Sequence, residues 1–342
     1  MNTIKITSWN VEHLARLVEP PLTSYEETRR DAIVAELEAI NPDILCLVEG
    51  PRGEDSIDQF TSELLANRWR AVKAADGEYG TRGTQWIWFL VKEALYAQCS
   101  LLPVETWDAF TTKNWDVHYW GDFESTRHRH YRHPQVLVLD WNGFRVEFIG
   151  LHLKSKFVNQ GASLWKAGGE KREEFIREAL KARVKLTTEA TNVREYIAAK
   201  FEQVEKPAIF IMGDLNDGPG KEFFEQKYLF FDLMSNIQGD IFQANQFMNH
   251  GLFDFPDHLR WTVKFKDFVA ETEAEANLVR PILLDHILFT QGLCDDSLPW
   301  RIDSNAGLVE HEIHQLINAS LSSKEQTSDH TPVSLTVTVK EE

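Results

Sequence analysis

Short apolar runs recur along the chain, and stretches with a helical spacing of apolar residues separate them. The runs at 4–9, 86–91 and 208–212 are rich in β-branched and aromatic residues, which predicts strands. The run at 44–48 is continuously apolar, as is typical of a strand buried on both faces. Apolar positions within 26–40 recur at helical spacing, which predicts a helix that ends at the following Asn-Pro step.

The second half of the chain continues this alternation of strands and helices. A hairpin is predicted over 136–151, turned at its Asn-Gly pair, and residues 332–339 alternate like a closing strand. Residues 170–204 are rich in Ala, Glu, Lys and Arg and predict a long charged helix. Few periods are clear within 221–280, and the polar stretch 304–326 predicts a loop. Together these elements indicate an α/β chain.

No linker rich in Pro, Gly or Ser and no repeat of fixed period divides the 342 residues. We therefore expect one domain over 1–342, with a loop insertion near 104–134 and a helical insertion near 160–204. The first insertion mixes aromatic residues with arginines and histidines. Two interpretations of it remain open: a platform that stacks bases and holds phosphates, or a packed surface loop.

Charge and cysteine content narrow the classes of protein. The net charge of −17 argues against a general binder of duplex DNA, although a local basic patch or bound cations would still permit a nuclease. Cys46, Cys99 and Cys294 form no CxxC pattern, so we expect ordinary thiols. The sequence has no apolar run of about 18 residues and no recognisable signal peptide, which predicts a cytoplasmic protein without stable membrane association. The oligomeric state stays open.

Polar residues stand at the ends of several predicted strands. Strand ends gather at the rim of a sheet, where loops build sites. Carboxylates, amides and histidines together suit a hard divalent cation and the hydrolysis of a phosphoester, because the cation prefers oxygen ligands. The residues in these positions are Asn10, Glu49, His152, Asp214, Asn216, Asp285, Asp329 and His330.

Glu49 is the leading candidate ligand for Mg²⁺ or Mn²⁺, with Asn10 beside it. A histidine that is tuned by a carboxylate can act as a base, and His330 with Asp285 fits that role.

Six motifs in order carry a resemblance to a known family. They resemble those of the endonuclease/exonuclease/phosphatase superfamily, which has the deoxyribonuclease-I-like fold, and the match runs from residue 4 to about 337. The resemblance implies a four-layer α/β sandwich of two mixed β-sheets flanked by helices. The motifs are Ser8-Trp9-Asn10-Val11, Leu47-Val48-Glu49, His152-Leu153-Lys154-Ser155, Gly213-Asp214-Leu215-Asn216-Asp217, Leu284-Asp285-His286-Ile287 and Ser328-Asp329-His330.

The resemblance also implies roles for the residues near a metal and a phosphate. It assigns Asn10 and Glu49 to the metal. It makes His152 and Asn216 phosphate-binding groups that stabilise the transition state. Asp329 becomes either a further metal contact or the partner of His152.

The remaining implied roles concern proton transfer and substrate binding. Asp214 would orient or activate the attacking water, and Asp285 would orient His330. Arg132 resembles an arginine that often precedes the strand leading to the first histidine, and it is assigned to the substrate. Lys154, just after that histidine, could bind a neighbouring phosphate.

The preferred prediction is a divalent-metal-dependent phosphoesterase, namely a nuclease that hydrolyses phosphodiester bonds in nucleic acid. The alternative is a phosphatase or phosphodiesterase acting on a small phosphoester, such as a phosphoinositide, a sphingomyelin-like lipid or a nucleotide. A catalytically inactive binding module is disfavoured, because competent residues occupy all the key positions. The sequence leaves the exo or endo mode and the number of metals open.

Overall fold

The structure is a computed structural model. It describes residues 2–75, 85–111, 114–119, 122–127, 130, 132–219, 222–228, 232–270 and 272–340.

The first sheet carries both ends of the described chain. Its strands β1 and β2 run parallel, whereas β1 and β17 run antiparallel, so the sheet is mixed. Its order is β15 (Trp300–Arg301), β17 (Val333–Val339), β1 (Asn2–Asn10), β2 (Ile44–Gly50), β4 (Trp86–Lys92) and β3 (Trp69–Ala71), and β16 (Gly307–Val309) also pairs with β17.

The second sheet is mixed as well, because β9 and β10 are parallel and their other neighbours are antiparallel. The predicted hairpin is present as β8–β9, and Asn142 and Gly143 both adopt positive φ, as a type I′ turn requires. The order is β11 (Met248–His250), β14 (Asp285–Thr290), β10 (Ala208–Asp214), β9 (Phe144–His152), β8 (Gln135–Trp141) and β5 (Cys99–Leu101).

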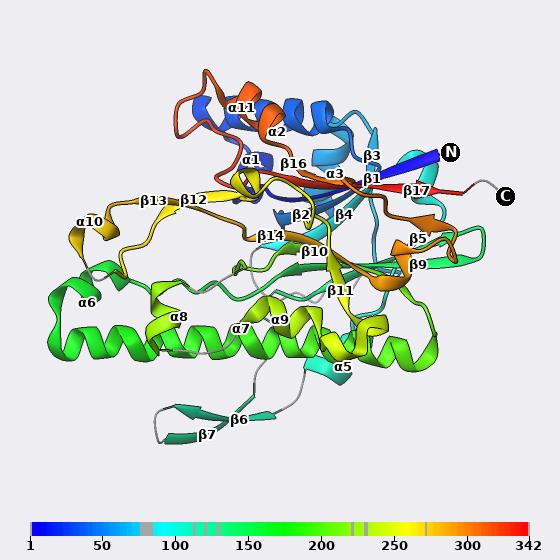
Figure 1. Cartoon of the computed structure of the whole chain (residues 1–342). Helices are drawn as coiled ribbons and strands as arrows, with labels where there is room; N and C mark the ends of the chain where they lie inside the picture. Colours follow the sequence, from blue (N-terminus) through cyan, green and yellow to red (C-terminus); the bar gives the residue numbers. More distant parts are fainter. Residues whose placement is uncertain are drawn as a thin grey trace.

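The two sheets pack face to face and helices cover their outer faces (Figure 1). Over the first sheet lie α1 (Ala15–Val18), α2 (Ser24–Ile40), α3 (Glu54–Gln59), a π-helical turn (Phe60–Leu64) and α11 (His311–Asn318). Along the second sheet runs α7 (Gly169–Gln203), accompanied by α5 (Glu105–Thr111), α6 (Gly161–Ala167), α8 (Phe223–Tyr228) and α9 (Leu233–Gln238). This arrangement confirms the predicted four-layer sandwich.

The remaining short elements are α4 (Glu93–Tyr96), α10 (Glu273–Ala276) and three 3₁₀ turns (Ile241–Gln246, Asp257–Leu259 and Gln291–Cys294). Two hairpins lie outside the main sheets: β6–β7 (Asn114–Tyr119 and Asp122–Arg127) and β12–β13 (Val263–Lys266 and Val279–Ile282).

The layer between the sheets is apolar and close. A Cβ atom at Gly150 of β9 would lie 2.9 Å from Ile87 and 3.1 Å from both Cys46 and Phe89. Glycine at this position therefore lets β9 approach β2 and β4. The close approach matters for function, because it brings the ends of strands from both sheets together.

The predicted loop over 304–326 is wrong, because this stretch contains β16 and α11. The helix is only two turns long, and it turns polar side chains inward. His314 and Asn318 both contact the buried Glu36 of α2. Ile313, Leu316 and Ile317 do have helical spacing, but over so short and polar a stretch this signal was passed over.

The long charged helix predicted at 170–204 is present as α7. Its status as an insertion, like the single-domain assignment, stays a prediction.

The stretch 104–134 has two described parts. Trp107 is buried and stacks on Tyr196 of α7 at 4.6 Å between ring centroids. The β6–β7 hairpin lies beyond α7, on the side away from both sheets (Figure 1). This placement does not favour the hairpin as a substrate platform beside the strand ends. Among the described residues, no helix is long and apolar enough to span a membrane.

Candidate active site

Strand register explains why residues far apart in sequence meet. In the second sheet Asp214, at the end of β10, lies opposite both His152 and Asp285. In the first sheet Asn10 ends β1, next to the end of β2. The two sheets meet here, because the Asn10 side-chain amide donates a hydrogen bond to Asp214 Oδ2 at 3.1 Å.

Glu49 is aimed into this edge by an irregularity in its strand. The register between β2 and β4 shifts between Leu47 and Gly50, and Glu49 adopts φ 61°, in the left-handed region. For a residue other than glycine, such a backbone is costly and is concentrated at functional sites. Glu49 Oε1 lies 3.9 Å from His152 Nε2, and Oε2 accepts the backbone N–H of His13 at 3.0 Å.

His330 is paired with Asp285, as the sequence suggested. Its Nδ1 lies 2.6 Å from Asp285 Oδ2, and both side chains are buried. Burial alone would lower the pKa of His330, but the carboxylates of Asp285, Asp214 and Asp329 outweigh it and raise the pKa to about 10. The imidazolium form is therefore favoured at neutral pH, and Nε2 is its second donor.

The loop that carries His330 is fixed from several sides. The Ser328 hydroxyl donates to the Asn10 carbonyl at 2.7 Å and accepts the His330 backbone N–H at 3.0 Å. The Trp9 indole donates to the His330 carbonyl at 3.1 Å. The Ser-Asp-His triplet is thus tied directly to the end of β1, so the last motif is held against the first.

Asp214 is the buried carboxyl at the centre of the site. Burial and nearby Asp285 raise its pKa to about 7, against the opposing effects of His330, the Asn216 N–H and the Asn10 amide. Its Oδ2 lies 3.5 Å from His152 Nε2. A carboxyl with a pKa near neutrality is suited to exchange a proton with water.

His152 and Asn216 stand on either side of that carboxyl. Burial, followed by repulsion from Arg132 and His330, holds the pKa of His152 well below its usual range, so the ring is neutral. Asn216 adopts φ 54°, and its amide donates to the Leu153 carbonyl at 3.0 Å.

Asp329 lies beside His330, not His152. Its side chain is 63% exposed, and Oδ1 lies 3.9 Å from His330 Nε2. The carboxylates beside His152 are Glu49 and Asp214. A metal role for Asp329 stays a prediction.

The two predicted substrate-binding cations are placed differently. Arg132 donates through Nε and Nη2 to the side-chain oxygen Oε1 of Gln85, at 3.2 and 2.7 Å, and the Gln85 Nε2 amide in turn donates to Glu49 Oε2. Lys154 turns toward α7, where its backbone N–H donates to Glu189 and its ammonium donates to the Ser155 carbonyl. Within the described part of the chain, no hydrogen bond joins the Lys154 ammonium to another predicted site residue.

Gln85 and Arg29 belong to the site and were missed by the sequence interpretation. Gln85 immediately precedes an antiparallel strand, which places it at the same edge as the strand ends, and that position was a usable signal. Arg29 donates to the carbonyls of Val11 and Glu12 on one side and Thr327 on the other. Arg29 lies within α2, and nothing in the neighbouring sequence indicates this contact.

The side chains fit a hard divalent cation. Glu49, Asn10 and Asp329 offer carboxylate and amide oxygens, which are the donors that Mg²⁺ and Mn²⁺ prefer. Burial, followed by repulsion from Asp285, raises the pKa of Asp214, and a cation bound nearby would offset the cost of charging this buried carboxyl.

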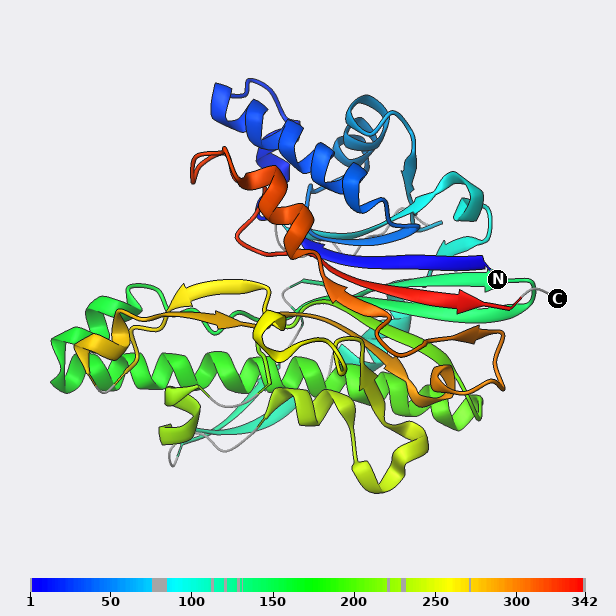
Figure 2. The ribbon, with the colours of Figure 1, turned by 45° about the horizontal axis from the view of Figure 1, so that its top comes forward.

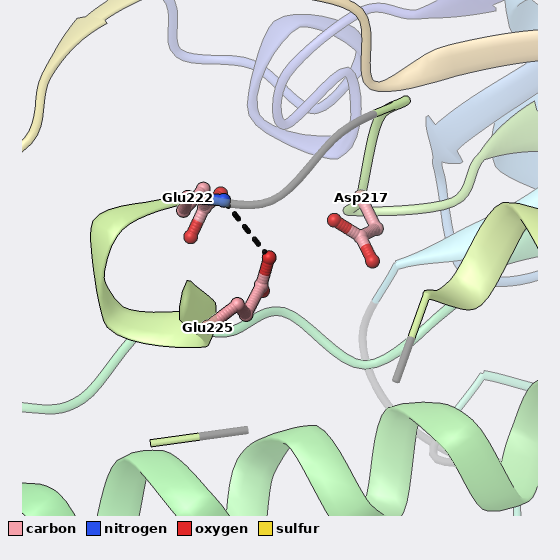
Figure 3. A group of neighbouring side chains, drawn as sticks. All are labelled: Asp217, Glu222 and Glu225. Carbon is pink, nitrogen blue, oxygen red and sulfur yellow. Dashed lines mark hydrogen bonds between the residues drawn. The ribbon is translucent and has the colours of Figure 1, made fainter. Parts of the chain in front are cut away.

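A second acidic group, Asp217, Glu222 and Glu225, is geometrically able to hold a metal ion (Figure 3). It already surrounds a cation, however, because Lys156 Nζ lies 2.7 Å from Asp217 Oδ1 and Glu222 Oε1 and 3.1 Å from Glu225 Oε1. We do not assign a metal to it.

Comparison with solved structures shows the same architecture elsewhere. TDP2 from C. elegans aligns with a TM-score of 0.52 and 14% identity over 98% of this chain and 75% of that chain. An endonuclease/exonuclease/phosphatase family protein from Bacteroides thetaiotaomicron aligns with a TM-score of 0.51 and 11% identity over 99% of both chains. This chain has the deoxyribonuclease-I-like fold. D. rerio TDP2, in a complex with a single-strand DNA product, shares the fold with a TM-score of 0.52 and 14% identity over 99% of this chain and 100% of that one.

No family model and no curated sequence matches the chain. At these identities the structural likeness establishes the fold alone, so the function is argued from the side chains.

Proposed function

We propose that the chain is a divalent-metal-dependent phosphoesterase whose active centre is the edge where β1, β2, β9, β10 and β14 meet. The observation that carries this proposal is the joined group of Asn10, Glu49, His152 and Asp214, which lies beside the His330–Asp285 pair. It combines oxygen donors for a cation, a carboxyl with a pKa near 7 and a charged imidazole. Phosphoester hydrolysis needs these three functions.

Each side chain takes a role that its surroundings support. Glu49 and Asn10 would hold Mg²⁺ or Mn²⁺, which when bound neutralises charge on the phosphate. Asp214 accepts a proton from the attacking water, because its pKa is close to neutrality. His330, held by Asp285, donates from Nε2 to a phosphate oxygen. This role differs from the base predicted from the sequence, since the pKa of about 10 favours the protonated ring.

His152 and Asn216 complete the cradle for the phosphate. The Nε2 atom of the neutral His152 lies 3.5 Å from Asp214 Oδ2 and 3.9 Å from Glu49 Oε1. The Asn216 backbone N–H donates to Asp214 Oδ1, and its side-chain amide donates to the Leu153 carbonyl. Neither needs to reorganise as charge develops on the phosphate, which is the condition for effective electrostatic stabilisation.

For the substrate, we propose hydrolysis of phosphodiester bonds in nucleic acid. One structural neighbour is recorded with a single-strand DNA product, and Arg132 lies at the rim of the site. A small phosphoester is the second candidate, favoured by the net charge of −17. Affinity for nucleic acid should fall steeply with salt because counterions are released, whereas affinity for a small phosphoester should change little.

A metal-supplemented activity panel tests the proposal. Protein stripped with EDTA is assayed on DNA, RNA and small phosphoesters with Mg²⁺ or Mn²⁺ restored. We expect metal-dependent cleavage that falls about 10²–10⁴-fold in Glu49→Gln and in His330→Ala. The exposed Glu63→Gln and His258→Ala serve as matched controls. Full activity in EDTA, or in either site variant, contradicts the proposal. Calorimetric titration with Mn²⁺ separately checks whether Glu49→Gln weakens metal binding.

A further inference from the structure

A cavity of about 450 Å³ opens directly beside the proposed active centre. Asn216, Asp329 and His330 line one end of it. The rest of its lining comes from the segment after β9, the β12–β13 hairpin, α7 and α8. Figure 2 shows this hairpin reaching beyond the sheets above α6 and α7. A phosphate held at His330 would therefore have one of its substituents at the mouth of the cavity.

The walls of the cavity are mainly apolar and aromatic. Phe265 and Ile282 face it from the hairpin, and Phe157 faces it from the segment after β9. Phe175 of α7 and Phe224 of α8 are almost fully buried behind it, with their rings edge to face at 6.0 Å. Binding an uncharged group against such walls is favourable, because apolar surface is removed from water. Aromatic rings in particular favour a flat group that can stack on them.

Two of the described cations that line the cavity, Lys156 and Arg183, are already engaged by carboxylates. Lys156 lies within 3.1 Å of Asp217, Glu222 and Glu225, the group drawn in Figure 3. Arg183 pairs with Glu222 at 3.0 Å and with Glu225 at 3.2 Å. Three carboxylates outnumber these two cations, so the cluster has no net positive charge that would attract a second phosphate.

The other charged groups of the lining lead to the same conclusion. Lys266 is exposed at the edge, and it shares the lining with the carboxylates of Asp267 and Asp329. A further phosphate entering the cavity would meet these carboxylates and the acidic cluster. Among the described residues of the lining, His330 and Asn216 are the donors that lie at the proposed phosphate position.

We propose that this cavity binds an uncharged apolar substituent, an aromatic ring or a short alkyl chain, of a phosphoester whose phosphate lies at His330 and Asn216. The inference rests on the proposed function and narrows it. On the side of the phosphate that faces the cavity, the substrate carries an apolar group and no further phosphate. A nucleobase and an alkyl chain share this chemistry, and the experiment below distinguishes them.

Equilibrium binding of phosphate monoesters tests the proposal, because each has a single substituent and its binding requires no turnover. Methyl, hexyl and phenyl phosphate and ethylene bisphosphate are titrated calorimetrically into the wild-type protein with Mg²⁺. We expect hexyl or phenyl phosphate to bind about tenfold or more tightly than methyl phosphate, since each buried methylene contributes to affinity. Stronger binding of the phenyl ester indicates a ring, and stronger binding of the hexyl ester indicates a chain. We expect the bisphosphate to bind no better than methyl phosphate.

Variants connect this preference to the cavity. Phe265→Ala should reduce the preference for the apolar ester about tenfold. Phe157→Ala, on a side chain that is 71% exposed, is a second variant with little risk to folding. Phe253→Ala, at another exposed phenylalanine outside the lining, should retain the preference.

Equal affinity for the methyl, hexyl and phenyl esters overturns the inference, as does tighter binding of the bisphosphate or a preference that neither wall variant alters. These results are distinct from failure of the proposed function, which would appear as a wild-type protein that cleaves no phosphoester in the presence of metal.

Discussion

Asp285 and His330 are 45 positions apart in the sequence, yet their side chains are joined at 2.6 Å. Because a carboxylate fixes the orientation and the charge of an imidazole, this contact determines how Nε2 meets a phosphate. We predict that Asp285→Asn lowers kcat about 10²-fold and leaves KM nearly unchanged, which steady-state kinetics can check. Asp31→Asn, at an exposed carboxylate, is the matched control. An Asp285→Asn variant with the kcat of the wild type would remove the pair from the mechanism.

Lys156 supports a second prediction for a single side chain. Its ammonium is buried among Asp217, Glu222 and Glu225, and their attraction raises its pKa despite the opposing cost of burial. Replacement by methionine would leave the three carboxylates with Arg183 as their remaining described cation. We therefore expect the free energy of unfolding to fall by about 3–5 kcal/mol in urea titrations.

The control for this change is Lys171→Met, which breaks an exposed pair with Glu174. That loss should be below about 1 kcal/mol. Adding Glu225→Gln to Lys156→Met should recover part of the stability, since it removes one of the unpaired charges. Equal stability of the two lysine variants would show that the buried cluster needs no ammonium.

At the level of elements, one helix of the first layer holds the loop that carries His330. Glu36 of α2 is fully buried and accepts a hydrogen bond from the Thr327 hydroxyl at 2.6 Å. Arg29, two turns earlier on the same helix, donates to the Thr327 carbonyl at 3.2 Å. The position of His330 therefore depends on a helix that does not itself reach the phosphate site.

Thr327→Val tests this dependence, because it keeps the shape of the side chain and removes the hydroxyl. The buried Glu36 carboxylate would lose a donor, so we expect a loss of about 1–3 kcal/mol in the free energy of unfolding. Displacement of His330 should also lower kcat about tenfold or more. Thr28→Val, which removes an exposed hydroxyl bond within α2, is the control. Faster amide exchange at 326–330 should accompany the change, and unaltered exchange together with wild-type kcat would refute the link.

The strands could be predicted well from the sequence because their patterns are local. The apolar runs located β1, β2 and β10 to within two residues at their ends, and the order of polar residues after them anticipated the joined group at the site. Polar residues following strands carry such information because register fixes their place at the sheet edge.

Other features depended on tertiary contacts that the local spacing of apolar residues does not indicate. The inward face of α11 is polar, Arg29 reaches across to a loop nearly 300 positions away, and the β12–β13 hairpin lies in a stretch without clear periodicity. The charged state of His330 also could not be read from its motif alone, because it depends on Asp285 and Asp214 from other segments as well as on the adjacent Asp329. These properties arise from tertiary packing, which outweighs local pattern.

For the whole molecule, pH should act through a buried pair of histidines. The Leu252 N–H donates to His250 Nδ1, which leaves the proton on His250 Nε2 to bond His286 Nδ1 at 2.8 Å. His286 Nε2 then donates to the Asp217 carbonyl at 2.8 Å. Each ring is thus used once as donor and once as acceptor, so both are satisfied in the neutral form.

Protonation of this pair should therefore cost stability as the pH falls. Burial lowers the pKa of His286 to about 4, against about 6.5 for an unfolded chain. Below pH 6.5 the unfolded chain binds a proton at His286 that the folded chain does not bind until about pH 4. The contribution of His286 to stability is therefore full above pH 6.5 and is lost as the pH falls across this window. His286 alone contributes roughly 3 kcal/mol to the loss. Urea unfolding at pH 7, 6, 5 and 4 measures this loss. The double variant His250→Gln/His286→Gln should flatten the dependence on pH, whereas the exposed His258→Gln should keep it. An equally steep slope in the double variant would assign the acid sensitivity to other groups.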